Sequence, residues 1–155
     1  FADQYRPAAQ PCDPPLKPFP ELRVVSVQGD EQASLARVAT EVNKALKDGA
    51  KPGDIAVLSL MGQAKSALCK ATSLGSVKIV RADAPKVDDE VVADTFLRFK
   101  GLERPVVIVT ELGGSPERYD VRMHVALTRA TLGCVVVGTD AEITRDRRLS
   151  AMRPA

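Results

Sequence analysis

The sequence is poor in the residues that build metal sites. It has a single histidine, and its three cysteines, Cys12, Cys69 and Cys134, lie far apart and form no CxxC pair. This spacing does not suit a zinc site, and one histidine cannot supply a ligand set. We therefore expect no metal site, and we expect the cysteines to be buried or neutral thiols in a reducing compartment.

The sequence also lacks the features of membrane and secreted proteins. No apolar run approaches the roughly 18 residues that a helix needs to cross a bilayer. The first residues, FADQYRPAAQ, do not follow the basic-then-apolar order of a signal peptide. We therefore expect a cytoplasmic protein that makes no membrane contact. The net charge of +2 and the pI of about 8.5 permit contact with nucleic acid but give it little support.

A phosphate-binding loop is missing as well. The stretch MGQAKS at 61–66 has the right place for one, between a predicted strand and a predicted helix. If Lys65 were the lysine of the motif G-x-x-x-x-G-K-[ST], glycines would be needed at positions 59 and 64. Those positions hold Ser59 and Ala64. Because the loop must bend so that successive N–H groups point at phosphate, we interpret Lys65 as a solvated helix residue.

The length of 155 residues suits one domain with its own core. Six prolines between positions 7 and 20 indicate an extended segment, so we assign 1–21 to a proline-rich linker or the end of an upstream segment. We assign 22–140 to the folded domain. The last residues, 141–155, are interpreted as a polar, arginine-rich tail.

Apolar runs and helical patterns alternate along the domain. The pattern predicts strands at 22–28, 55–60, 77–80, 91–95, 106–110 and 134–138, and helices at 31–47, around 63–71 and at 117–131. Asp30 is a plausible N-cap of the first helix, and Gly49 lies just past its end. Continuous Val/Ile runs are typical of parallel strands that are buried on both faces. The sequence therefore predicts an α/β sandwich.

Two motifs are more specific than this pattern. TFLRFKGLERPVVIV, at 95–109, and VALTRA, at 125–130, resemble motifs V and VI of the UvrD, PcrA and Rep group of superfamily 1 DNA helicases. GAKPGDIAVLSL, at 49–60, is similar to a strand that follows motif IV in these proteins. The resemblance implies a C-terminal RecA-like motor domain, which is a three-layer α/β sandwich of the P-loop NTPase type with a mostly parallel sheet.

The resemblance also implies half of an ATP site. Arg129 would be the catalytic arginine that contacts the γ-phosphate, a role that suits a planar and permanently charged guanidinium. Gly101 would allow a tight turn, and Glu103 would accept hydrogen bonds from the ribose. ATP and Mg²⁺ would be held mainly by an upstream N-terminal RecA-like domain of the same protein. This chain alone would bind neither tightly and would be inactive.

The same resemblance implies contacts with single-stranded DNA. Thr95 matches a family threonine that contacts the DNA backbone, and a hydroxyl suits a phosphate oxygen. Arg98 and Lys100 are the neighbouring cations, so we predict a DNA-binding set of Thr95, Arg98 and Lys100. An ordinary solvated arginine is the alternative interpretation for Arg98.

The chain departs from the family pattern at several positions. Leu97 replaces a histidine, Arg104 replaces an aromatic residue, and His124 stands where relatives often carry tyrosine. Only 34 residues separate Leu60 from Thr95, which leaves no room for the large accessory insertion of UvrD and PcrA. The motif IV arginine is expected upstream of Phe1. The chain therefore resembles a short form of the motor domain.

Two other functions compete with this hypothesis. A degenerate RecA-like module could bind a partner protein or DNA without an ATPase cycle, and Leu97 and the mild net charge favour it slightly. A small flavodoxin-like domain that binds a nucleotide by itself is a weaker alternative, because a glycine-rich first loop is missing.

Overall fold

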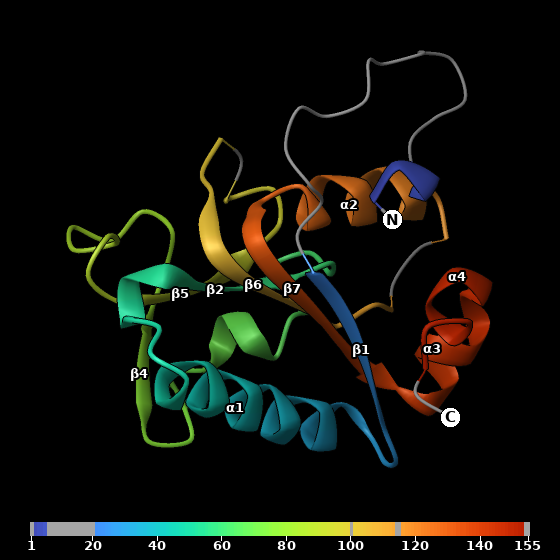
Figure 1. Ribbon diagram of the computed structural model, residues 1–155, viewed down its shortest axis with the longest axis horizontal. Coiled ribbons are helices and arrows are strands. Elements are labelled where there is room, and N and C mark those ends of the chain that lie inside the picture. Colours follow the sequence, from blue (N-terminus) through green and yellow to red (C-terminus); the bar gives the residue numbers. More distant parts are fainter. Residues whose placement is uncertain (1, 6–20, 100, 114–115, 154–155) are drawn as a thin grey trace.

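The computed structural model describes residues 2–5, 21–99, 101–113 and 116–153. Its centre is a seven-stranded sheet in the order β1-β7-β6-β2-β5-β4-β3, in which all neighbours are parallel except β3 and β4 (Figure 1). The strands are β1 (Glu21–Val27), β2 (Ile55–Ser59), β3 (Ser73–Leu74), β4 (Val77–Val80), β5 (Val91–Thr95), β6 (Arg104–Thr110) and β7 (Ala130–Thr139).

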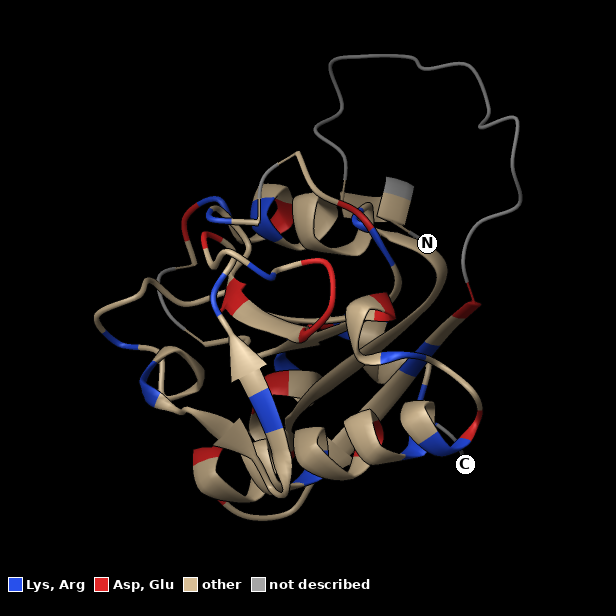
Figure 2. Ribbon diagram, turned by 90° about the vertical axis from the view of Figure 1, so that its left-hand side faces the viewer, with Lys and Arg blue, Asp and Glu red and all other residues tan. Residues whose placement is uncertain are grey.

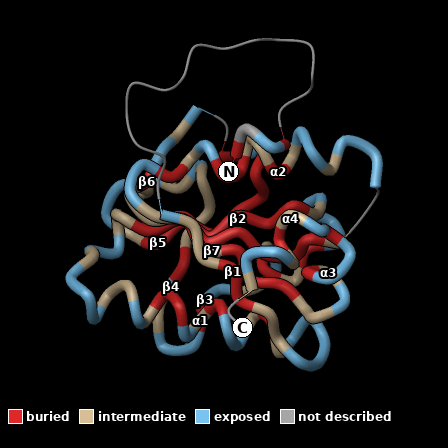
Figure 3. The backbone as a smooth tube through the Cα atoms, turned by 45° about the vertical axis from the view of Figure 1, so that its right-hand side comes forward, coloured by how far each residue is buried: buried red, intermediate tan, exposed pale blue. Residues whose placement is uncertain are grey.

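Helices cover both faces of this sheet, and Figure 3 shows the buried residues concentrated in the strands between them. On one face, α1 (Glu31–Lys47) packs through Val38 and Val42. On the other, α2 (Tyr119–Leu127) and the short 3₁₀ helix η1 (Ala2–Tyr5) pack against a second cluster. The three layers and the parallel strands confirm the predicted α/β sandwich with a mostly parallel sheet.

The first helix is the element that the sequence specifies most directly. It spans the predicted residues, and the Asp30 side chain accepts a hydrogen bond of 3.1 Å from the Ala33 N–H. Gly49 follows the helix with a positive φ of 108°, a backbone conformation that favours glycine. The N-cap prediction is confirmed, because each of these features depends only on local residues.

Two predicted helices are wrong in extent. Around 63–71 the structure has turns and a single 3₁₀ turn, η3 (Leu68–Lys70), and the Ser66 hydroxyl accepts from the Cys69 N–H. Such a side-chain bond competes with regular helix bonding. The helix predicted at 117–131 is limited to α2, because Arg118 before it has a φ of 59° and β7 already begins at Ala130.

The C-terminal residues belong to the folded domain. In place of the expected tail, α3 (Asp140–Arg145) and α4 (Arg147–Ser150) pack on the core through Ile143 and Leu149, which are fully buried. A short 3₁₀ turn, η2 (Pro52–Asp54), precedes β2. Of the segment assigned to a linker, residues 6–20 lie outside the described residues. None of the described helices is long and apolar enough to span a bilayer.

Candidate functional site

The residues of the predicted ATP site meet where β6 and β7 begin, which we call the amino edge. The Arg104 N–H donates a hydrogen bond of 3.0 Å to the Arg129 carbonyl, and Arg104 pairs with Ala130 in the parallel ladder. Glu103 and Arg129 therefore precede neighbouring strands and lie side by side. This proximity follows from the parallel pairing of β6 with β7, because the starts of parallel strands lie at one edge of a sheet.

Arg129 lies in the turn between α2 and β7. Its N–H donates to the Ala126 carbonyl at 3.2 Å, which closes the end of the helix. The side chain is half-buried, and its Nε atom has no hydrogen-bond partner among the described residues. The guanidinium thus has donors that the described part of the domain does not use, and a buried N–H without an acceptor is costly.

The loop before β6 carries Gly101 and Glu103. Gly101 has a φ of 83°, and a Cβ built there would meet no atom within 4 Å. The glycine is therefore required by the backbone turn and not by close packing. The Glu103 side chain is exposed, and its carboxylate makes no hydrogen bond or ion pair with another described residue. Lys100, which we predicted as a DNA contact, lies outside the described residues.

The other predicted DNA contacts lie at the opposite edge of the sheet, where β2, β5, β6 and β7 end, which we call the carboxyl edge. Thr95 is buried, and its Oγ1 accepts a hydrogen bond of 3.2 Å from the Arg98 N–H. The Arg98 guanidinium forms ion pairs with Asp83 at 2.6 Å and with the buried Asp94 at 3.3 Å. Both residues are thus already engaged within the domain.

A buried carboxylate occupies the place where a phosphate loop would bind its ligand. Glu111 directly follows β6 and has a φ of 53°, which is unusual for a residue with a Cβ. Its carboxylate accepts hydrogen bonds from the Ser66 hydroxyl at 2.5 Å and from the Ala67 N–H at 2.8 Å. These donors belong to the turn that contains Lys65. The arrangement agrees with the rejection of a phosphate loop here, because an internal anion takes the donors.

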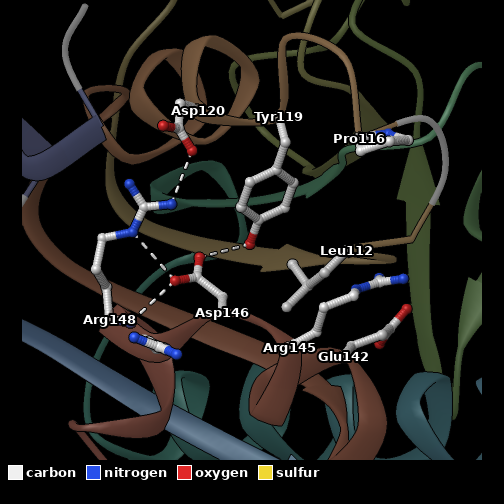
Figure 4. Close-up of a pocket in the computed structure, with 9 residues that line it drawn as sticks. Leu112, Pro116, Tyr119, Asp120, Glu142, Arg145, Asp146 and Arg148 are labelled. Carbon is white, nitrogen blue, oxygen red and sulfur yellow. Dashed lines mark hydrogen bonds and ion pairs between the residues drawn. The ribbon is translucent and has the colours of Figure 1, made fainter. Parts of the chain in front are cut away.

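Sequence analysis missed a polar cluster that joins the two ends of the described chain. Figure 4 shows Asp146 accepting from Tyr119 and Arg148, and Tyr5 donates to the same carboxylate at 3.0 Å. Arg148 also pairs with Asp120 at 2.7 Å and stacks 3.8 Å from the centre of the Tyr5 ring. Tyr5 and Asp146 are 141 positions apart, so no sequence spacing could have indicated this contact.

The charges of this cluster are balanced from within. Burial raises the pKa of Asp146, but hydrogen bonds from Arg148, Tyr119 and Tyr5 outweigh it and hold the pKa below its usual range. Burial and the Asp146 charge raise the pKa of both tyrosines. A cavity of about 570 Å³ lies beside the cluster, with Leu112 and Pro116 in its wall (Figure 4). The buried polar groups of the cluster have partners within the domain, so we interpret the cluster as structural.

Other candidate chemistry is sparse in the described residues. Histidine, cysteine, aspartate and glutamate nowhere form a group of three that could hold a metal ion within residues 2–5, 21–99, 101–113 and 116–153. Cys134 is buried, and burial raises the pKa of its thiol to about 12, so it stays neutral as predicted. In the view of Figure 2, Lys and Arg are interspersed with Asp and Glu along the described part of the chain.

Comparison with known proteins identifies a structural likeness only. No protein-family model matches the chain, and no curated protein matches it. A solved structure described as the C-terminal domain of a possible DNA helicase from Lactobacillus plantarum WCFS1 is similar, with a TM-score of 0.51 and 17% sequence identity. The match covers 85% of this chain and 83% of that one. At this identity the comparison shows that the two chains share a fold.

Proposed function

We propose that this chain is the C-terminal RecA-like motor domain of an ATP-dependent DNA helicase or translocase. Three observations support the proposal. The sequence carries motifs similar to motifs V and VI in the family order. The sheet has the parallel α/β architecture that such a domain requires. A similar fold occurs in the C-terminal domain of a possible DNA helicase.

The observation that carries the proposal is that Glu103 and Arg129 directly precede neighbouring strands at the amino edge. The two come from motifs 26 positions apart, yet the Arg104–Arg129 backbone bond brings them together. The Arg129 guanidinium would donate to γ-phosphate oxygens, and the Glu103 carboxylate would accept from the ribose. Neither has a partner among the described residues that would have to be displaced.

The rest of the ATP site would come from an upstream P-loop domain of the same protein. ATP bound between the two domains would supply the phosphoryl transfer to water that drives movement, with Mg²⁺ and the phosphate loop on the other side. In this arrangement Arg129 stabilises negative charge that develops on the γ-phosphoryl group. Glu103 orients the nucleoside. This chain by itself would neither bind ATP tightly nor hydrolyse it.

Contact with single-stranded DNA is proposed through Thr95 and Arg98 at the carboxyl edge, together with Lys100, which lies outside the described residues. The Thr95 hydroxyl keeps its proton available, because Oγ1 acts only as an acceptor toward Arg98. Arg98 would have to exchange its contacts with Asp83 and Asp94 for a phosphate. Such a contact positions the backbone without reading its sequence.

The same ion pairs favour a second candidate, a binding or regulatory module that has lost the ATPase cycle. If Arg98 serves only to hold Asp83 and Asp94 together, the domain retains the fold but not the coupling of DNA to ATP. Under this alternative the amino edge would be inert toward nucleotide.

The experiment joins this chain to the P-loop domain and measures ATP hydrolysis with and without single-stranded DNA. Arg129→Ala is expected to lower kcat by about a thousandfold or more, as loss of an arginine finger does. Arg147→Ala is the matched control, because Arg147 is exposed on α4, away from the amino edge. DNA-stimulated hydrolysis that survives Arg129→Ala would remove the mechanism. Magnesium-dependent turnover by the 155-residue chain alone would contradict the shared site.

A further inference from the structure

Arg104 is a buried arginine between the two residues of the candidate ATP site. It is only 8% exposed, and it stands where the helicases that this chain resembles carry an aromatic residue. We propose that Arg104 is a positioning residue that fixes Glu103 relative to Arg129 and so sets how the ribose is read. The inference rests on the proposed function, because it assigns Arg104 an effect exerted through Glu103.

The backbone of Arg104 holds the Arg129 side of the pair. Its N–H donates to the Arg129 carbonyl at 3.0 Å. The register between β6 and β7 then shifts, since Arg104 pairs with Ala130 but Val106 pairs with Gly133. Pro105, between them, has no N–H to donate. The Arg104–Arg129 bond is therefore the last backbone tie before the loops that carry the two candidate residues.

The side chain of Arg104 holds the Glu103 side. Nη1 donates to the Glu103 carbonyl at 3.0 Å, and Nη2 donates to the Val87 carbonyl at 3.1 Å. The guanidinium also lies 5.7 Å from the ring centre of Phe99, which is fully buried. One planar group thus joins the loop before β6 to the 84–89 loop and to the core. Lysine could not reproduce this, because its ammonium is a single point donor.

The incomplete pairing of the Arg104 guanidinium indicates that this residue does more than stabilise the fold. The ion-pair partner, Asp88, lies 3.5 Å away and has a side chain that is 90% exposed, so it counters the charge weakly. The Arg104 Nε has no hydrogen-bond partner among the described residues. A buried guanidinium with incomplete pairing is costly, and an apolar side chain often serves stability equally well. What the guanidinium adds is a fixed carbonyl position at Glu103.

This arrangement has a specific consequence for nucleotide selection. Gly101 allows the loop many conformations, so without Arg104 the Glu103 carbonyl would lose its side-chain donor and the loop that carries the Glu103 carboxylate would be less restrained. A site built to hydrogen-bond a hydroxyl rejects an analogue that lacks it, but only while the acceptor is held in place. Loss of Arg104 should therefore weaken the preference for ATP over deoxy-ATP. If Arg104 had a purely structural role, its loss would lower kcat/KM for ATP and kcat/KM for deoxy-ATP by the same factor.

The test uses this chain joined to its P-loop domain and compares kcat/KM for ATP with kcat/KM for 2′-deoxy-ATP and 3′-deoxy-ATP. Glu103→Ala should reduce the preference for ATP over one of the analogues by about tenfold, the value of a hydrogen bond to a charged group. Arg104→Lys and Arg104→Phe should reduce the same preference several-fold. Lys78→Ala, an exposed cation on β4, is the matched control and should leave it unchanged.

The outcomes separate the inference from the proposed function. If Glu103→Ala abolishes the preference while both Arg104 variants keep it, Arg104 does not position Glu103 and the inference is overturned. If Glu103→Ala leaves the preference for ATP over both analogues unchanged, Glu103 does not contact the ribose. The inference about Arg104 is then overturned as well. Should Arg104→Phe fail to fold, as judged by thermal unfolding, Arg104→Lys still decides the question, since it leaves the Phe99 core in place.

Discussion

The charged side chains at the two edges of the sheet differ in whether they have partners within the domain. At the carboxyl edge, the buried Asp94 accepts from the Ala82 and Thr95 N–H groups and pairs with Arg98, and Glu111 binds the turn at 66–67. At the amino edge, Glu103 and Arg129 make no side-chain contact of this kind with any described residue. These carboxyl-edge charges are thus part of the fold, and the Glu103 and Arg129 side chains at the amino edge have no partner in its described part.

This difference explains why the chain should not bind nucleotide by itself. Open parallel sheets usually bind ligands outside the carboxyl ends of their strands. Here the Glu111 carboxylate already occupies the donors after β2. The uncommitted groups lie at the other edge, where one guanidinium and one carboxylate cannot enclose a triphosphate. They suit the second half of a shared site.

The largest effect on stability is expected at Asp146, beyond the end of β7. Asp146→Asn removes the negative charge to which Arg148 and both tyrosines donate hydrogen bonds. Breaking such a buried pair should lower the free energy of unfolding by about 3 kcal/mol. Urea unfolding followed by circular dichroism measures the loss. A change below about 1 kcal/mol would show that the tyrosines find other partners.

The same cluster should make stability depend on pH. The pKa of Asp146 is lower in the folded chain, so its contribution is present above the usual aspartate pKa of about 4 and is lost as pH falls through the folded value. Burial raises the pKa of Glu41, but Arg23 and Arg37 outweigh it and hold the pKa below its usual value. Glu41 therefore acts in the same direction. The unfolding midpoint measured from pH 7 down to pH 2 should fall more steeply for the natural chain than for Asp146→Asn.

A smaller loss is expected at Glu111. Glu111→Ala leaves the Ala67 N–H without its acceptor and should cost about 2 kcal/mol. Glu111→Gly removes the same carboxylate but relieves the positive φ, so it should cost about 1 kcal/mol less than the alanine variant. Thermal unfolding of the pair separates the two contributions. Equal losses would show that the backbone at 111 carries no strain.

The smallest effect is expected at the amino edge. Glu103→Gln and Arg129→Met, in the isolated chain, should each change the free energy of unfolding by less than about 0.5 kcal/mol, because neither side chain is bonded within the described domain. The measurement is urea unfolding, as for Asp146→Asn. A loss of 2 kcal/mol or more at Arg129 would place it among the structural residues and erase the contrast between the edges.

The sequence predicted what depends on neighbouring residues. The Asp30 cap, the extent of α1 and the Val/Ile strands all follow from local chemistry. The neighbouring positions of Glu103 and Arg129 follow from the parallel pairing of β6 with β7, which brings the starts of the two strands together. What escaped prediction depends on tertiary register. Ser66 and Glu111 are 45 positions apart. The helices at 140–150 pack on the core through Ile143 and Leu149, although the Thr139–Glu142 capping box is a local signal for the first of them.

Titration of MgATP against the P-loop domain alone, this chain alone and the two joined tests the shared site most directly. This chain alone should show no binding at millimolar ATP, and the joined protein should bind more tightly than the P-loop domain alone. Arg129→Ala should weaken MgATP binding by the joined protein toward the affinity of the P-loop domain alone. Tight binding to the isolated chain, or equal affinity with and without it, would contradict the account.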